Sequence, residues 1–244
     1  MEVRFSAKEV RRIQNMRDDV LESKKGKKHY VEREKGIGKW KQWESDDLWL
    51  ALAYQVMHPQ TRAKTVSDYA KLKGNRQLSI NRLARLRTRD DLEEHIARSI
   101  PGMVQGARKA SNIADDFLLF VDRKEKEFLL WDFLERQDKS VSKRNRLWSK
   151  EALEMERKTK DILRHSVFGF GPKSAADYLN TIGFSANLIA LDTNVKKSIQ
   201  YVKRRKLKLD KNWYAYENAF VGVAKRLKIA PCLLDTVLWY WPQL

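Results

Sequence analysis

Apolar residues along this chain of 244 residues recur every three or four positions, which is the spacing of one face of an α-helix. Leu48, Leu52 and Val56 would share one such face, and Leu92 and Ile96 would share another. Strict alternation of apolar and polar residues, the mark of a half-buried strand, is scarce. Ten glycines and five prolines are fewer turn-forming residues than a typical soluble protein carries. The pattern therefore predicts an all-α fold.

Local chemistry predicts where the helices begin and end. Ser45 precedes two aspartates and is a favourable N-cap, so a helix is expected to begin there. It should stop at His58, because a proline disfavours the helical conformation of the residue before it. Further helices are expected over residues 61–72, 79–98, 104–122, 151–164, 212–228 and 232–241.

Two segments of the chain are highly charged. Residues 1–45 are highly charged and are expected to form a basic N-terminal extension to a domain spanning 46–244. Residues 123–150 are also strongly charged. No apolar run approaches the roughly 20 residues that span a bilayer, and the first residues lack the apolar core of a signal peptide. A membrane or secreted protein is not expected.

The net charge favours a polyanionic partner. Fifty Lys and Arg against 32 Asp and Glu leave a formal charge of +18, which favours nucleic acid first and an anionic membrane second. The single cysteine, Cys232, excludes a disulfide framework and a four-cysteine iron–sulfur cluster. The four histidines lack the spacing of metal ligands, so no metal site is expected.

One stretch, residues 167–195, carries a pattern with chemical content: VFGFGPKSAADYLNTIGFSANLIALDTNV. Gly169 and Gly171 permit a tight turn between two helical segments, and Pro172 suits the first position of the second helix. Backbone amides at such a turn can hold a phosphate. The alternative is an ordinary corner between two helices.

This stretch resembles the helix-hairpin-helix element of the HhH-GPD DNA glycosylase superfamily, in which a G-x-G-x-K-x-A hairpin precedes an apolar run ending in a catalytic aspartate. Three more segments resemble the archaeal-type 8-oxoguanine DNA glycosylase/AP lyases: LALAYQVMHPQTRAKTV (50–66), ARKASNIADDF (107–117) and LLDTVLWYW (233–241). The resemblance covers about residues 46–120 and 160–241. It implies a two-lobed helical bundle with a central cleft.

The resemblance also implies a reaction. Lys173 would be the nucleophile that attacks the sugar and stays attached as a Schiff base, and Asp192 would stabilise charge or move protons. The implied function is base-excision repair by an N-glycosylase with AP lyase (β-elimination) activity that removes 8-oxoguanine. Two other functions stay open: a non-catalytic helix-hairpin-helix DNA-binding protein, and a monofunctional glycosylase that uses Asp192 and water. In isolation Lys173 could be a phosphate contact and Asp192 an N-cap.

Such an enzyme must extrude the damaged nucleotide and grip the flanking phosphates. The expected DNA-binding residues are Gly169, Gly171, Lys196, Lys197, Arg204, Arg205, Gln60 and Lys109. Among these Gln60 is the candidate for entering the duplex or contacting the opposite base, with a helix cap as the alternative. Trp239 and Tyr240 are expected to line the base pocket, unless they belong to a buried helix end. For the cations, the alternative is a solvated face.

The sequence departs from the family pattern in three places. Residues 123–150 are longer than the family pattern implies between the ARKASNIADDF segment and the hairpin, so they are expected to be an insertion. Asn194 stands where a histidine is common, and residues 241–244 hold no lysine where the archaeal-type group uses one to recognise damaged guanine. The exact lesion is therefore left open. No cofactor is expected beyond the monovalent cation that the resemblance implies on the hairpin carbonyls, residues 167–171. The expected partner is duplex DNA with a damaged base, bound by a monomer in the cytoplasm, at the nucleoid, or in a nucleus.

Overall fold

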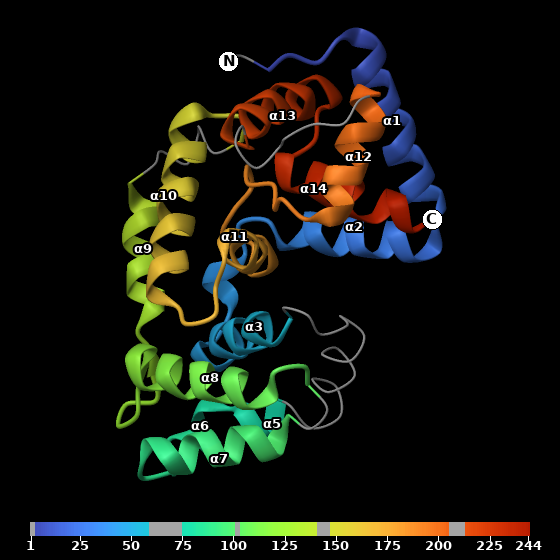
Figure 1. Ribbon diagram of the computed structural model, residues 1–244. Coiled ribbons are helices and arrows are strands. Elements are labelled where there is room, and N and C mark those ends of the chain that lie inside the picture. Colours follow the sequence, from blue (N-terminus) through green and yellow to red (C-terminus); the bar gives the residue numbers. More distant parts are fainter. Residues whose placement is uncertain (1–2, 59–74, 101–102, 141–146, 205–212) are drawn as a thin grey trace. The chain divides into compact units, whose positions relative to one another are not determined.

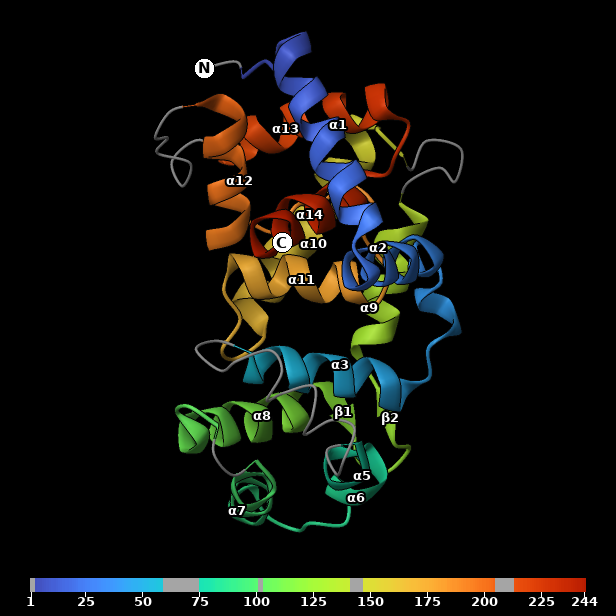
Figure 2. The ribbon, with the colours of Figure 1, turned by 90° about the vertical axis from the view of Figure 1, so that its right-hand side faces the viewer.

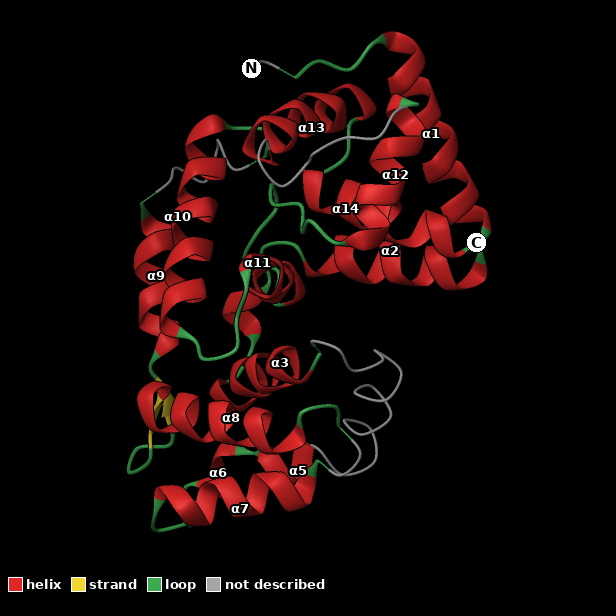
Figure 3. Ribbon diagram, viewed as in Figure 1, coloured by secondary structure: helices red, strands yellow, loops and turns green. Residues whose placement is uncertain are grey.

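The computed structural model describes residues 3–58, 75–100, 103–140, 147–204 and 213–244. Their regular structure is almost entirely helical (Figure 3). The strands found in these ranges, β1 (Val121–Asp122) and β2 (Glu127–Phe128), form one short antiparallel ribbon in which Val121 pairs with Phe128. The prediction of an all-α fold is confirmed. None of the described helices is both long and apolar enough to cross a bilayer.

The chain folds into two compact units, as the two-lobed prediction requires. The first unit comprises Met1–Trp40, Ser140–Lys160 and Leu179–Leu244, and the second comprises Lys41–Lys139 and Asp161–Tyr178. Each unit therefore contains segments from distant parts of the sequence.

Helix α14 (Pro231–Tyr240) is the central element of the first unit. It contacts α1 (Ala7–Glu22), α2 (Lys24–Gly36), α12 (Thr193–Lys203) and α13 (Trp213–Leu227) (Figures 1 and 2). Every residue from the start of α14 to Leu238 is buried. A helix that is apolar on nearly all sides must be enclosed by others, so the apolar run near the C-terminus organises this unit.

The N-terminal segment, expected as an extension, packs into the core of the first unit. Helix α1 begins with a capping box, in which Ser6 and Glu9 satisfy each other's backbone amides. Ile13, Met16 and Val20 then form a buried stripe at helical spacing. Residues 1–40 thus supply part of the apolar surface that covers α14, while most of their charged side chains are exposed.

The second unit is built around α3. Its helices are α3 (Ser45–Met57), α5 (Asn75–Leu78), α6 (Ile80–Leu83), α7 (Arg89–Ser99), α8 (Gly106–Phe120) and α9 (Leu130–Lys139). The Trp49 ring of α3 packs against Phe117 and Phe128, and its indole N–H donates to the Leu78 carbonyl at 2.7 Å. One aromatic residue therefore joins α3 to α5, α8 and the β-ribbon.

Several predicted boundaries need correction. The N-cap of α3 is Glu44 and not Ser45, and Asp46 of the first turn accepts a bond from the Ile80 amide at 2.6 Å. The helix expected over 79–98 is divided into α6 and α7, because Thr88 caps a new helix. The helix expected over 61–72 lies outside the described residues. The remaining segments agree with α8, α10 (Lys150–Ser166), α13 and α14 to within a few residues.

Candidate active site and nucleic-acid interface

The glycine turn joins α10 to α11 (Pro172–Thr181), as predicted. Gly169 has φ of +81°, a conformation that side chains with a Cβ rarely adopt, and a Cβ there would lie 2.8 Å from the Asn112 amide nitrogen. The Phe170 amide donates to the Val167 carbonyl at 3.3 Å and closes the turn. Pro172 is the first residue of α11. The helix-hairpin-helix geometry is therefore present in the residues where the sequence placed it.

A buried carboxyl group lies beneath this turn. Asp116 of α8 is fully buried, and its Oδ1 accepts the Phe168 backbone N–H at 2.8 Å. Its Oδ2 is buried without a hydrogen-bond partner in the described part of the chain. Burial raises the pKa of Asp116 to about 8. The sequence did not single out Asp116, because an acidic residue in an amphipathic helix normally indicates an exposed position.

Lys173 is the second residue of α11, and its side chain is 44% exposed. Its Nζ lies 2.5 Å from Oδ2 of Asp177, one helical turn later. An adjacent carboxylate favours the charged amine, whereas a nucleophilic lysine must lose its proton. Any nucleophilic role of Lys173 therefore requires this ion pair to open.

Two further basic groups of the second unit influence this region. Burial lowers the pKa of the His58 imidazole, and the charges of Lys173 and Lys109 lower it further, while Asp177 acts in the opposite direction. Lys109, expected to contact phosphate, is only 4% exposed, and its Nζ donates to the Met57 carbonyl at 2.6 Å. Burial lowers the pKa of the Lys109 amine. Its amine thus binds the C-terminal end of α3 inside the unit.

Asp192 lies in the first unit as the N-cap of α12. Its Oδ1 accepts the Val195 backbone N–H at 2.8 Å, and the residue is half-buried. The capping role that the sequence offered as an alternative is therefore present. Capping uses one carboxylate oxygen and fixes the orientation of the side chain.

The expected phosphate contacts on α12 differ in exposure. Lys196 is half-buried, Lys197 is exposed, and Arg204 is exposed at the C-cap with φ of +53°. Arg205 and Gln60 lie outside the described residues. The described cations after Asp192 thus stand at both ends of α12.

The aromatic residues expected in a base pocket lie at the end of α14. Tyr240 is 9% exposed, and its ring centroid lies 5.8 Å from that of His29 on α2. Trp239 is partly buried against the core of the first unit. The Trp241 and Tyr201 rings are tilted by 37° relative to each other, with their centroids 4.5 Å apart. For Tyr240 this is the environment of a buried helix end.

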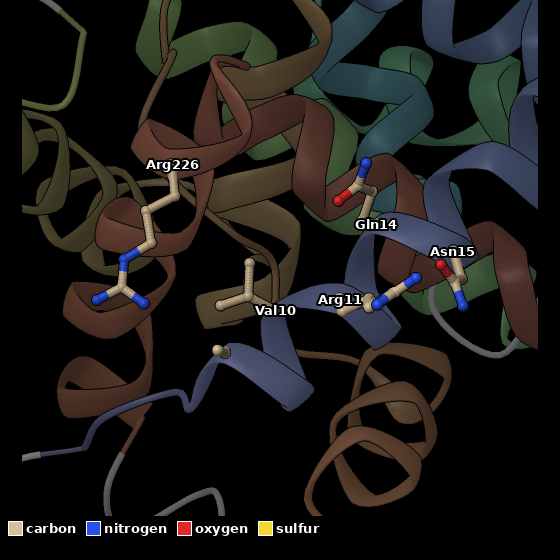
Figure 4. Close-up of a pocket in the computed structure, with 6 residues that line it drawn as sticks. Val10, Arg11, Gln14, Asn15 and Arg226 are labelled. Atoms are coloured by element: carbon tan, nitrogen blue, oxygen red, sulfur yellow. The ribbon is translucent and has the colours of Figure 1, made fainter.

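A pocket of about 550 Å³ opens on the first unit beside α1 (Figure 4). Its lining consists of Ala7, Val10, Arg11, Gln14, Asn15 and Arg226. The guanidinium groups of Arg11 and Arg226 point in different directions (Figure 4), and Arg226 donates to the Phe5 carbonyl at 3.4 Å. Because its polar groups do not converge, this pocket is not a candidate site. No cluster of three or more metal-ligating side chains occurs among the described residues.

Comparisons with known proteins show which fold this chain shares. No protein-family model matches the chain. The 8-oxoguanine DNA glycosylase/AP lyase of Thermoplasma volcanium is 28% identical over 90 residues, which are 36% of this chain and 44% of that protein. The Methanocaldococcus jannaschii 8-oxoguanine glycosylase/lyase, solved with DNA containing 8-oxoguanine, superposes with a TM-score of 0.61 at 16% identity over 95% of each chain.

The chain has the fold of the 8-oxoguanine DNA glycosylases. The Thermotoga maritima enzyme of that name agrees, with a TM-score of 0.62, 17% identity, and coverage of 93% of this chain and 96% of that one. For the fold, the resemblance inferred from the sequence is confirmed. The sequence match spans less than half of the length of the curated relative.

Proposed function

We propose that the protein is a base-excision repair enzyme, a DNA N-glycosylase with AP lyase activity that removes 8-oxoguanine from duplex DNA. One observation carries the proposal. In a fold shared with 8-oxoguanine glycosylases, a glycine hairpin presents a partly exposed lysine, Lys173, at the start of α11. A lysine in this position suits Schiff-base chemistry, because the positive end of a helix disfavours a second positive charge.

The reaction would begin once Lys173 has lost its proton and its pair with Asp177 has opened. The Nζ atom forms a bond to C1′ of the damaged nucleotide while the bond from C1′ to the base breaks, and the departing base takes up a proton. The bond from C1′ to the ring oxygen O4′ then breaks, O4′ takes up the proton that Nζ loses, and an imine is left between Nζ and C1′. Loss of a proton from C2′ then expels the 3′ phosphate and cuts the strand.

Asp192 would supply the negative charge that this chemistry needs. Positive charge develops on the sugar as the base leaves, and a carboxylate lowers the energy of that state. The capping bond from Val195 holds one oxygen of Asp192, so the carboxylate is preorganised and does not have to be reoriented during the reaction.

DNA binding would use the hairpin amides and the cations of α12. The hairpin carbonyls of residues 167–171 are neutral oxygen ligands, which suit a monovalent cation; the Val167 and Gly171 carbonyls each accept one hydrogen bond and keep a second lone pair. Such a cation would add positive charge facing a phosphate. The protein would act as a monomer on genomic DNA, at a nucleoid or in a nucleus.

Borohydride trapping tests the proposal. A duplex containing 8-oxoguanine, or an abasic site, should form a covalent adduct with the wild-type protein when the imine is reduced. Lys173→Gln should lose the adduct. Lys158→Gln, which removes an exposed lysine from α10, should keep it and controls for the loss of one positive charge.

The same duplexes, assayed with and without alkali, separate the alternatives. Base release without strand cleavage or trapping would indicate a monofunctional glycosylase that uses Asp192 and water. Salt-dependent binding without base release from any lesion would indicate a DNA-binding protein and would overturn the proposal.

A further inference from the structure

The segment Gly183–Ala190, which precedes Asp192, is buried although it forms neither helix nor strand. Irregular backbone normally stays at the surface, because buried amides must find hydrogen-bond acceptors. In this segment every backbone N–H group has a hydrogen-bond acceptor. Those of Gly183, Phe184 and Ser185 bind carbonyls at the end of α11. The backbone N–H groups of residues 186–190 donate instead to side-chain oxygens.

Glu156 of α10 accepts four hydrogen bonds from the middle of the segment. Its Oε1 accepts from the Ala186 amide and the Asn187 side chain, both at 3.0 Å. Its Oε2 accepts from the Ser185 hydroxyl at 2.7 Å and the Asn187 amide at 2.9 Å. Burial raises the pKa of Glu156, whereas these bonds lower it.

Two more buried carboxylates hold the end of the segment. Glu217 of α13 accepts the Ile189 amide at 3.2 Å, and its other oxygen pairs with Arg157 at 2.6 Å. Asp235 of α14 accepts the Ala190 amide at 3.0 Å. The intervening Leu188 amide donates to the Ser185 hydroxyl at 3.1 Å. Acceptors from three different helices thus meet on one stretch of backbone.

Burying these three carboxylates costs free energy, so stability alone does not account for the arrangement. Buried carboxylates lose their hydration, and well-packed apolar residues often give equal or greater stability. What charged acceptors provide is geometry, since charge-assisted hydrogen bonds are short and directional. The restrained backbone ends two residues before Asp192, whose own carboxylate is held by Val195.

We propose that Glu156, Glu217 and Asp235, here called the carboxylate cradle, position Asp192 for its part in the reaction. They act through the backbone and do not touch the substrate, so they are positioning residues. The inference rests on the proposed function, because it assigns the cradle a purpose in the chemistry of Asp192.

Variants at two positions of the carboxylate cradle test this role. Glu156→Gln replaces one acceptor oxygen with an N–H donor that faces backbone donors, so it should displace the segment. Asp235→Ala removes the acceptor of the Ala190 amide, whereas Asp235→Asn keeps an oxygen there. Thr159→Val is the matched control, because it removes a buried hydroxyl from the same helix, bonded to the Met155 carbonyl and not to the segment.

Two measurements distinguish positioning from stability. The single-turnover rate of base excision should fall about 100-fold in Glu156→Gln and Asp235→Ala, the cost of misplacing a reacting group by about 1 Å, with the Kd for the lesion duplex unchanged. Asp235→Asn should recover most of the rate. Native-state hydrogen exchange of the Val195 amide reports whether the Asp192 cap is intact. This exchange should be faster in Glu156→Gln and Asp235→Ala than in the Thr159→Val control.

Excision rates and Val195 exchange that match those of Thr159→Val would overturn the proposal. If the wild-type protein excises no base but Val195 exchange responds as expected, the proposed function fails while the positioning of Asp192 by the cradle stands. The two failures are therefore distinguishable.

Discussion

At the scale of single residues, Asp116 shows how one buried group couples the hairpin to its surroundings. It binds the Phe168 amide of the turn and has a pKa raised to about 8 from 3.8. The folded protein therefore holds this proton more tightly than the unfolded chain. The corresponding contribution to stability is complete below about pH 4 and is lost as the pH rises to about 8.

Asp116→Asn should remove this pH dependence. Asparagine keeps an oxygen for the Phe168 amide but does not titrate, so the free energy of unfolding should fall less between pH 5 and pH 8 than in the wild type. Urea unfolding at several pH values measures the difference. Asp122→Asn is the control, because backbone hydrogen bonds lower the pKa of partly exposed Asp122 and place its titration below this range. Equal slopes in wild type and Asp116→Asn would contradict the assignment.

At the scale of elements, the helices were predictable and their tertiary connections were not. Caps and periodicity are local, so most helices appear close to where the sequence places them. The β-ribbon at 121–128 was missed because strands of two residues leave no alternation to detect. The split between α6 and α7 was missed because the Thr88 cap lies inside an otherwise continuous apolar pattern.

The backbone of Gly183 lies close to the end of α2 in the first unit, so this position should not tolerate a side chain. Its φ is +76°, and a Cβ would overlap the carbonyl oxygen of Gly36 at the end of α2. Gly183→Ala should therefore lower the free energy of unfolding by about 2–3 kcal/mol. Gly222→Ala, in open space at an exposed position of α13, should raise it by up to about 1 kcal/mol. Denaturant unfolding compares them, and a harmless Gly183→Ala would refute the close approach.

At the scale of the whole molecule, the main feature is the net positive charge. A net charge of +18 exceeds what solubility requires. Part of this charge lies on α2, where Lys24, Lys25, Lys27 and Lys28 are exposed although Tyr30 of the same helix is buried. In the proposed complex with DNA, much of the binding energy should come from the release of counterions, independent of base sequence.

Binding to an undamaged duplex should weaken steeply with salt. Six or more phosphate contacts would reduce the affinity about 10³-fold or more between 50 and 200 mM salt. Fluorescence anisotropy with a labelled duplex measures this slope. Lys197→Gln, at an exposed position on α12, should reduce the slope by about one unit, whereas Lys158→Gln on α10 should leave it unchanged. A slope near zero would exclude an electrostatic interface.

The sequence by itself determined the helical class, most helix positions, the glycine turn and the location of Lys173 and Asp192, because each of these depends on residues close together in the chain. Only the tertiary structure decided which polar groups are buried. The bond from Phe168 to Asp116 and the burial of Lys109 each join residues about 50 positions apart, and the carboxylate cradle joins four segments. Contacts over such distances leave no periodic trace, because any acidic or basic residue on a helix suits solvent until the fold places a donor or acceptor beside it.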